Sequence, residues 1–319
     1  MATGTYVIGI DVGGQTTKLG VVDARGTVLA QTVIRTDNHS TVEPYIEEVA
    51  EAVNKIIADA KAEGEIRGIG VGAPNGNYYT GNIESAPNLP WAHSTVEFAK
   101  LLSEALNGLP VALTNDANAA AVGEMTYGAA RGMKNFIMIT LGTGVGSGIV
   151  INGEVVYGHD GFAGELGHTA AVRNNGRVCN CGKTGCLETY CSATGVARTA
   201  REWLELTDEP SVLRSLDSIA SKDVYDAAKD GDKLALKIFE FTGKMLGRSF
   251  SDFIAFSAPE AIVLFGGLAR AKEFLREPIE TAMNENVLPL WRNKVKIVFS
   301  QLKESDAAIL GASALAWEL

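Results

Sequence analysis

Apolar residues at the start of the chain fall into three short runs, rich in β-branched side chains and separated by polar or glycine-containing turns. The runs read "TYVIGIDV", "TTKLGVVD" and "TVLAQTVIR", and they predict a three-stranded antiparallel meander. The same succession returns in "FIMITLGTGVGSGIVINGEVV", where Ile139 occupies the place that Ile10 has in the first copy. A period of about 129 residues is too long for a solenoid, so we interpret the repeat as a duplicated domain core.

The stretches after each meander combine helical spacing with further short apolar runs. Residues 41–63 place apolar side chains three and four apart and stop at Gly64, which predicts a helix. Further strands are predicted at "IRGIGVGA", "LPVALTND", "AIVLFGG" and "VKIVFS". Further helices are predicted over residues 94–106, at "ANAAAVGEMTYG", through most of 193–257, over 268–286 and at "DAAILGASALAWE". Strands that alternate with helices indicate an α/β fold, and the duplication indicates two α/β domains facing each other across a cleft.

Composition and charge narrow the classes of partner. The chain has 319 residues, 46% of them hydrophobic, which is enough to bury the cores of two domains. Its net charge of −10 argues against a nucleic-acid groove or an anionic membrane surface. The start, "MATGTYVIGIDVGG", lacks the basic residues of a signal peptide, and no apolar stretch reaches the roughly 20 residues of a spanning helix. We therefore expect a cytoplasmic protein that binds neither nucleic acid nor membranes.

Two glycine-rich turns, in matching halves of the repeat, have the chemistry of phosphate-binding loops. Glycines let the backbone approach an anion closely, and a tight turn points successive N–H groups at one place. Asp11 ends the first strand and offers the carboxylate that Mg²⁺ prefers, with water between them. No P-loop sequence occurs, and the G-x-G-x-x-G dinucleotide motif fails because Ser147 stands at its last glycine and both turns lead into strands. The candidate phosphate contacts are Gly13, Gly14, Gln15, Thr16, Thr17 and Lys18 in the first turn, and Gly142, Thr143 and Gly144 in the second.

The four cysteines of the chain are clustered. Three of them, Cys179, Cys181 and Cys186, lie in "CNCGKTGC", and Cys191 follows. In a reducing compartment such a cluster indicates metal ligands rather than disulfides. Zinc prefers four nitrogen or sulfur ligands, of which the motif supplies three, and His168 and Cys191 compete for the fourth place.

Several of these segments resemble a known superfamily. "GIDVGGQTTKLGVV" and "LGTGVGSGIV" are similar to the two phosphate loops of the actin-like sugar kinases, whose α/β domains are ribonuclease H-like. "FGG" at residues 265–267 resembles their adenosine-side motif and adds Gly266 and Gly267 as nucleotide contacts. Within that superfamily, "ELGH" followed by "CNCGKTGCLE" resembles the ROK family of sugar kinases and repressors, and the match extends from end to end.

The resemblance implies roles for the residues around the cysteines. His168, from "ELGH", is the implied fourth zinc ligand, and the metal is structural because four protein ligands leave no open position. The zinc would then staple a loop that no helix or strand holds. Glu165 and Glu188 are implied to accept hydrogen bonds from sugar hydroxyls, and the second ring nitrogen of His168 to contact the sugar.

The resemblance also bears on the segment "LTNDANAAA". By itself, Asn115 or Asp116 before a run of alanines predicts an ordinary helix N-cap. The family pattern implies that Asp116 is the general base for the attacking sugar hydroxyl, and that Asn115 and Asn88 hold neighbouring hydroxyls. Gly76 belongs to a turn similar to the family's Gly-x-Pro-Gly, with the departure that Asn75 stands at the second glycine.

The function that the resemblance implies is that of an ATP- and Mg²⁺-dependent kinase acting on the 6-hydroxyl of glucose. Another hexose, such as N-acetylglucosamine, N-acetylmannosamine or fructose, is the alternative substrate, and polyphosphate the alternative donor. A sugar-sensing protein without catalysis is the alternative class, although repressors of the family carry an N-terminal helix-turn-helix and the first strand here begins near Met1. We expect a smaller domain from residues 1–114 with about 305–319, a larger domain from 115–304 with the zinc loop and a helical insertion, and a homodimer.

Overall fold

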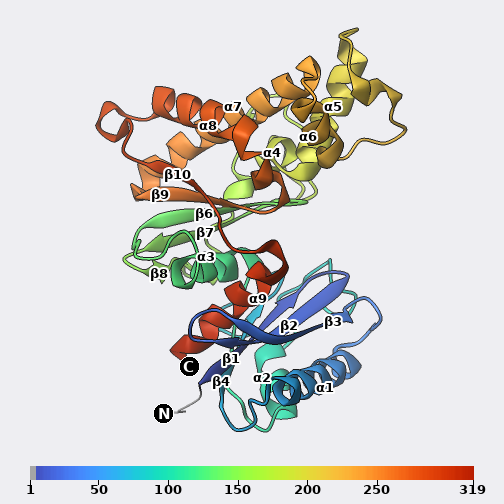
Figure 1. The fold of residues 1–319 in the computed structure, drawn as a ribbon, viewed down its shortest axis with the longest axis vertical. Coiled ribbons are helices and arrows are strands. Elements are labelled where there is room, and N and C mark those ends of the chain that lie inside the picture. Colours follow the sequence, from blue (N-terminus) through green and yellow to red (C-terminus); the bar gives the residue numbers. More distant parts are fainter. Residues whose placement is uncertain (1–4) are drawn as a thin grey trace. The chain divides into compact units, whose positions relative to one another are not determined.

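The computed structural model describes residues 5–319, apart from the side chains at positions 304 and 305. The chain divides into two compact units, each with its own sheet (Figure 1). The first unit contains the residues up to Met133, Gly153–Gly164 and Gln301–Leu319, and the second contains Lys134–Asn152 and Glu165–Ser300. Within the described part of the chain, none of the helices is both long and apolar enough to span a bilayer.

The first unit contains the predicted meander. Its sheet has the order β3-β2-β1-β4-β5, in which β1, β2 and β3 are antiparallel and β1, β4 and β5 are parallel. The strands are β1 (Tyr6–Val12), β2 (Thr16–Asp23), β3 (Val28–Arg35), β4 (Ile66–Gly72) and β5 (Val111–Thr114). Alternation along β1 sends Ile8 and Ile10 into one apolar cluster and Val7 into another, so both faces of this sheet are covered.

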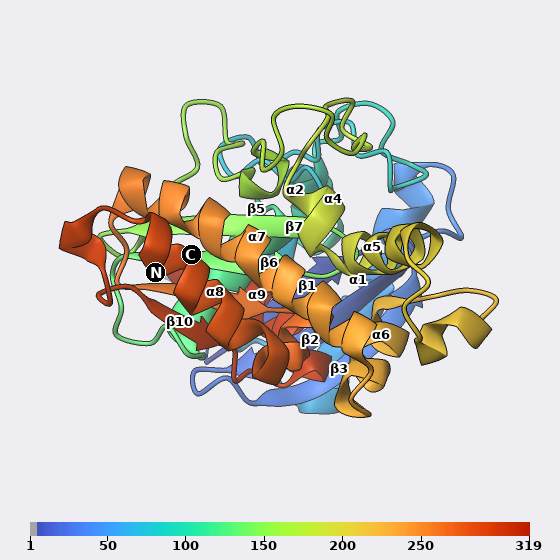
Figure 2. The same cartoon turned by 90° about the horizontal axis from the view of Figure 1, so that it is seen from above.

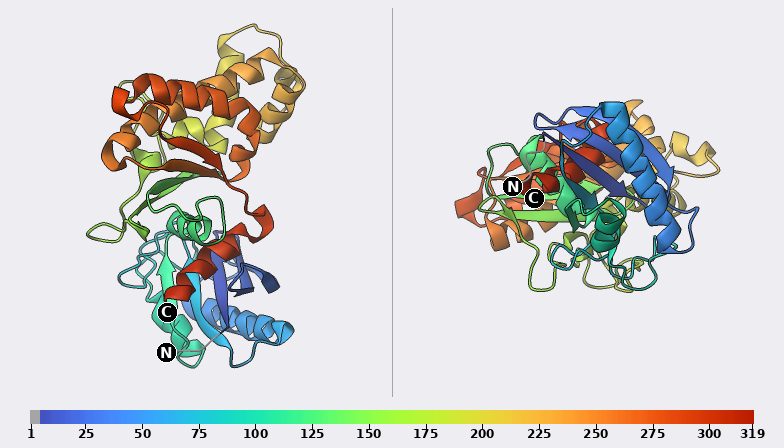
Figure 3. Two further views of the ribbon diagram at one scale, coloured as in Figure 1. Left: turned by 60° about the vertical axis from the view of Figure 1, so that its left-hand side comes forward. Right: turned by 90° about the horizontal axis from the view of Figure 1, so that it is seen from below.

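Helices cover both faces of that sheet. The cluster around Ile8 and Ile10 also contains residues of α1 (Val42–Ala60) and α2 (Phe98–Ala105). The other face carries α9 (Glu304–Leu315) and the short 3₁₀ helix η5 (Ala316–Glu318), with α3 (Asp116–Thr126) beside α9 (Figure 3). A Cβ built on Gly9 would lie 2.0 Å from the carbonyl oxygen of Ile309, so α9 rests directly on the strand backbone.

The unit boundaries differ from the expected domains at α3. The sequence assigned residues from 115 onward to the larger domain, whereas the contacts place α3 in the first unit. The reason is a close approach between α3 and α9, where a Cβ on Gly123 would lie 2.6 Å from the Cα of Gly311. The C-terminal segment belongs to the first unit, so that unit is discontinuous in sequence.

The second unit repeats the topology of the first, as the duplicated sequence predicts. Its sheet has the order β10-β9-β6-β7-β8, so β8-β7-β6-β9-β10 corresponds to β3-β2-β1-β4-β5. Helices α7 and α8 pack side by side (Figure 2). The strands of this sheet are β6 (Phe136–Leu141), β7 (Val145–Ile151), β8 (Glu154–Val155), β9 (Ala261–Phe265) and β10 (Lys296–Phe299). The two-residue edge strand β8 pairs with β7, but it belongs to the segment Gly153–Gly164 that is grouped with the first unit. The helices are α4 (Glu188–Cys191), α5 (Ala193–Leu206), α6 (Ser221–Lys229), α7 (Lys233–Ser257) and α8 (Lys272–Asn286), with 3₁₀ turns η1 (Leu166–His168), η2 (Val212–Ser215), η3 (Gly267–Ala271) and η4 (Pro289–Trp291).

Candidate functional site

The first glycine turn is the hairpin between β1 and β2. The N–H of Gly13 donates to the carbonyl of Thr16 over 3.0 Å and closes it. Gln15 at its tip is exposed, and Thr16 is half-buried. A Cβ on Gly14 would lie 2.9 Å from the carbonyl oxygen of Asn88, so the segment that contains Asn88 lies against this hairpin.

Thr17 differs from the other predicted phosphate contacts. Its side chain is fully buried, and its hydroxyl lies 2.8 Å from that of Thr36 and 2.5 Å from that of Tyr45. Strand alternation explains the difference, because Thr16 and Lys18 face the opposite side of β2. We therefore correct the expectation for Thr17 and assign its hydroxyl to the internal network beneath the hairpin.

Two carboxylates lie near each other at the carboxyl ends of β1 and β5. Burial and the charge of Asp116 raise the pKa of Asp11 to about 6, against the opposing effect of Lys18. Desolvation by the surrounding protein raises the pKa of Asp116 as well, although this residue is partly accessible to solvent. The N–H of Ala117 donates to Asp116 Oδ1 over 2.9 Å, which lowers this pKa and limits the rise. The pair thus joins a candidate metal-binding carboxylate to a candidate base.

The start of α3 combines the two interpretations that the sequence left open. Asn115 is the N-cap, and its Oδ1 accepts from the N–H of Asn118 over 2.6 Å. Asp116 is the first residue of the helix. Capping is therefore done by Asn115, and the carboxylate of Asp116 lies in the first turn, where the N–H groups have no partner within the helix ladder and the N–H of Ala117 donates to Asp116 itself.

The turn with Asn75 is compatible with a residue other than glycine. Asn75 has a left-handed φ of 52°, and its Nδ2 donates to the carbonyls of Glu84 and Ser85 over 3.0 Å each. Asparagine tolerates this conformation better than most residues do. A Cβ on Gly76 would lie 2.4 Å from the carbonyl oxygen of Thr114, so Gly76 lets the turn pack against the strand that leads into Asn115.

A cluster of aromatic residues, which sequence patterns did not reveal, holds residues 157–161 against the turn. The rings of Tyr78 and Tyr157 stack with centroids 4.0 Å apart. Asn77 Nδ2 donates to the carbonyl of Asp160 over 2.7 Å, and the Tyr79 hydroxyl donates to that of Gly158 over 2.8 Å. These partners are about 80 residues apart in sequence, so no local periodicity marks them.

In the second unit, the predicted metal ligands converge. One ligand atom each from His168, Cys179, Cys181 and Cys186 lies within 4.8 Å of the others. The Sγ atoms of Cys181 and Cys186 are 3.7 Å apart, which is close to the spacing of about 3.8 Å for two thiolates around a tetrahedral zinc. Cys191 is fully buried and donates to the carbonyl of Thr242, outside this group. The donor set therefore fits zinc with His168, and not Cys191, as the fourth ligand.

Arg177 connects the loop that contains the cysteines to α4 and α5 by hydrogen bonds that need no metal ion. It donates to Glu202 through Nε over 3.1 Å and through Nη2, to the carbonyl of Thr189 over 2.8 Å and to the hydroxyl of Thr199 over 2.9 Å. Its guanidinium also lies 4.5 Å from the ring centroid of Tyr190. No sequence motif pointed to this residue.

Glu165, Glu188 and the second glycine turn lie around the metal loop. Glu165 Oε2 is 4.0 Å from His168 Nε2. Glu188 starts α4, and its Oε2 accepts from the N–H of Val145, at the end of the turn, over 2.9 Å. Gly266 has a φ of 102° and packs where a Cβ would lie 2.6 Å from the carbonyl oxygen of Leu141, so the "FGG" motif lies beside the strand that enters this turn.

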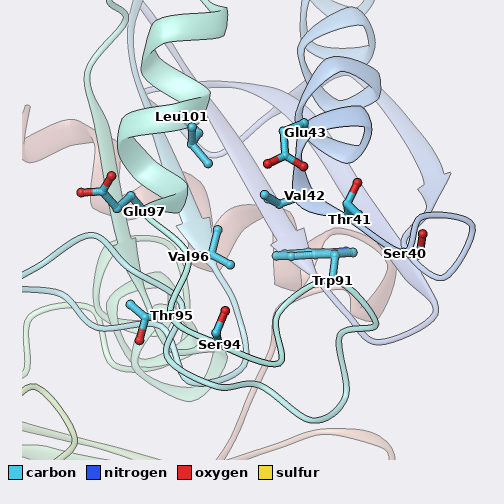
Figure 4. Close-up of a pocket in the computed structure, with 10 residues that line it drawn as sticks. All are labelled: Ser40, Thr41, Val42, Glu43, Trp91, Ser94, Thr95, Val96, Glu97 and Leu101. Carbon is cyan, nitrogen blue, oxygen red and sulfur yellow. The ribbon is translucent and has the colours of Figure 1, made fainter.

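A separate hollow of about 400 Å³ opens in the first unit, and none of the predicted site residues lines it. Figure 4 shows Trp91 between the start of α1 and the segment around Val96. Trp91 stacks on Tyr45, whose hydroxyl contacts Thr17. The hollow thus lies behind the hairpin network.

Comparison with known proteins places the chain in one family. The sequence profile of the ROK family matches residues 7–318. A glucokinase of Halalkalibacterium halodurans is 37% identical, with 96% of this chain and 93% of the relative covered. A glucokinase of Thermotoga maritima is 35% identical over 97% and 96% of the two chains. A xylose repressor of Caldicellulosiruptor bescii is 28% identical, and the match covers 97% of this chain but 77% of the repressor.

A solved structure of the same family has a similar fold. A ROK family glucokinase from Streptomyces griseus, in complex with glucose and AMPPNP, superposes with a TM-score of 0.79 at 31% identity. The match covers 98% of this chain and 100% of that one.

Proposed function

The chain belongs to the ROK family, and on that premise we propose that it is an ATP-dependent hexose kinase that transfers the γ-phosphoryl group to the 6-hydroxyl of glucose. The observation that carries the proposal is the similarity to glucokinases at 35–37% identity over nearly the whole of both chains. The carboxylate pair of Asp11 and Asp116 supports the same chemistry, because phosphoryl transfer to an alcohol needs a proton acceptor and a site for a divalent cation.

In this proposal Asp116 is the general base. Its carboxylate accepts the proton of the sugar hydroxyl as that oxygen attacks the phosphorus. A raised pKa favours this role, because a base works best when its pKa approaches the working pH. The proposed contacts to the sugar hydroxyls are Asn115, Asn88 and the turn with Gly76, together with Glu165, His168 and Glu188.

The two glycine turns hold the nucleotide. The first contributes N–H groups and side chains from Gly13, Gly14, Gln15, Thr16 and Lys18, and the second contributes Gly142, Thr143 and Gly144. Gly266 and Gly267 take the adenosine side. Asp11 would hold Mg²⁺, which supplies charge neutralisation on the phosphates when it is bound.

Zinc has a structural role in the proposal. His168, Cys179, Cys181 and Cys186 would fill its coordination, so that no open position is left for chemistry. Its effect is to fix the loop between Glu165 and Glu188, the two carboxylates proposed to bind the sugar.

The location and the assembly of the protein are also proposed. None of the four cysteines forms a disulfide, which suits the reducing cytoplasm. Phe256, Leu288 and Leu290, near the C-terminal ends of α7 and α8, are 91%, 55% and 54% exposed, which supports pairing of two copies through the second unit. Light scattering of the purified protein measures the mass of the assembly. A monomer at all concentrations would contradict the proposed dimer.

The substitution Asp116→Asn tests the central role. We expect ADP release coupled to glucose to fall about 10²- to 10⁴-fold, which is the usual contribution of a general base. Glucose affinity, measured by calorimetry, should stay within a few-fold because the amide keeps the shape of the carboxylate. Near-normal turnover in this variant would show that Asp116 is not the base.

A panel of hexoses separates the alternatives. Fastest turnover with N-acetylglucosamine, N-acetylmannosamine or fructose would change the substrate, and turnover with polyphosphate would change the donor. Sugar binding without any turnover would favour a sensor, the class to which the similar xylose repressors belong.

A further inference from the structure

The second glycine turn is fastened along one side by residues of α4 and α5. Glu188 Oε2 accepts from the N–H of Val145 over 2.9 Å, and the N–H of Ala193 donates to the carbonyl of Gly142 over 2.8 Å. The hydroxyl of Thr194 donates to the carbonyl of Thr143. Gly142, Thr143 and Val145 of the turn are therefore hydrogen-bonded to the segment that follows the metal loop.

Glu188 occupies the space that a side chain at position 144 would need. A Cβ on Gly144 would lie 2.4 Å from Glu188 Oε2, whereas a Cβ on Gly142 would meet nothing within 4 Å. Neither glycine has a positive φ, so alanine fits the backbone at both places. A side chain would therefore meet a carboxylate at Gly144 and open space at Gly142.

The other side of Glu188 faces the metal loop. Cys179 Sγ is 3.8 Å from Glu188 Oε1, and Cys186 precedes Glu188 by two residues. One carboxylate thus contacts a predicted metal ligand with one oxygen and the nucleotide turn with the other. A change in the position of this side chain therefore alters its contacts with both the metal loop and the nucleotide turn.

We propose that Glu188 is shared between the hexose site and the nucleotide turn, so that the two substrates affect each other's binding within this unit, and that Thr194 is a positioning residue for the turn. The inference rests on the proposed function, in which a sugar hydroxyl donates to Glu188. A bound hexose restricts the carboxylate to the rotamer that holds the N–H of Val145. The turn then has fewer conformations to lose when phosphate binds, and the coupling acts equally in the other direction.

Two alanine substitutions in the same turn test the coupling from the nucleotide side. Gly144→Ala displaces the carboxylate, so we expect glucose affinity, measured by calorimetry without nucleotide, to fall at least about 10-fold, as for a lost hydrogen bond to a charged group. Gly142→Ala is the matched control and should bind glucose within about twofold of the wild type. Equal glucose affinity in the two variants, with both folded, would overturn the inference.

Failure of the proposed function is a different outcome. Wild-type protein that binds no glucose would remove the proposed function, and this inference with it. Normal binding by the wild type and by Gly144→Ala would remove this inference alone.

Thr194 gives a second test, at an exposed position where a substitution leaves the core intact. Thr194→Val should weaken AMPPNP binding about 2- to 12-fold, the range for one neutral hydrogen bond, and raise the KM for ATP with an unchanged melting temperature. Thr194→Ser keeps the donor and should restore both values. Thr207→Val, which removes a similar bond to the carbonyl of Trp203 at the end of α5, is the control. An unchanged AMPPNP affinity in Thr194→Val would overturn the positioning role.

Discussion

The burial of Asp11 makes a quantitative prediction for the substitution Asp11→Asn. Folding raises the pKa of this carboxyl from 3.8 to about 6. The protonated form is therefore favoured in the folded state, and this contribution to stability is complete below pH 3.8 and is lost as the pH rises through 6. Asparagine carries no charge at any pH, so the stability of the variant should not fall over this pH range.

The magnitude follows from the size of the shift. A rise from 3.8 to about 6 corresponds to about 3 kcal/mol in the free energy of unfolding at neutral pH. Asp11 is half-buried, and solvent screening reduces this value, so we expect Asp11→Asn to be about 1–3 kcal/mol more stable than the wild type at pH 8. At pH 4 the two proteins should differ little.

Urea unfolding at pH 4 and pH 8, without nucleotide or Mg²⁺, measures both differences. Asp23→Asn is the matched control of opposite sign, because hydrogen bonds from the N–H groups of Thr27 and Arg25 lower the pKa of Asp23. That variant should lose stability at pH 8. If Asp11→Asn is no more stable than the wild type at pH 8, or gains equally at pH 4, the burial of a charged carboxylate is not the cause.

Three further perturbations have expected outcomes. Removal of zinc with a chelator should lower the melting temperature and weaken glucose binding together, and added zinc should restore both; calorimetry of metal-free protein with unchanged affinity would contradict the link. Thr17→Val removes the hydroxyl partner of Thr36 and Tyr45 and should cost about 1–3 kcal/mol of unfolding free energy in urea, while the KM for ATP stays within twofold; a large KM increase would return Thr17 to the phosphate contacts. Arg177→Lys keeps the charge but loses the planar fork to Glu202, so about 2 kcal/mol of stability should be lost, and wild-type stability would show that the bonds contribute nothing.

The arrangement of strands and helices could be predicted because its signals are local. The meander and α1 follow from periodicity within a dozen residues. The duplicated order of strands follows from the return of the same local pattern about 129 residues later. The convergence of the four candidate metal ligands could also be predicted, since three of them lie in one motif and the resemblance supplied His168.

Other features depend on contacts that leave no periodic trace. Tyr78 and Tyr157 stack across a large separation in sequence, and Arg177 bonds to Glu202 on a different element. The Thr17 side chain points into the interior because side chains alternate along β2. This alternation could be seen in the sequence, but the interpretation of the segment as a phosphate loop did not take it into account. The assignment of α3 to the first unit required the close packing of Gly123 against α9.

The packing of α9 on the first strands has a consequence for the order of events during synthesis. At about 5–20 residues per second, on the order of 15 to 60 s separate the emergence of Gly9 from that of Ile309, which must cover it. Until then the first sheet has one bare apolar face, while nearly all of the later unit is already available to fold. A released chain that lacks residues 305–319 should therefore keep the second unit in a protease-resistant form and leave the first unit open to cleavage.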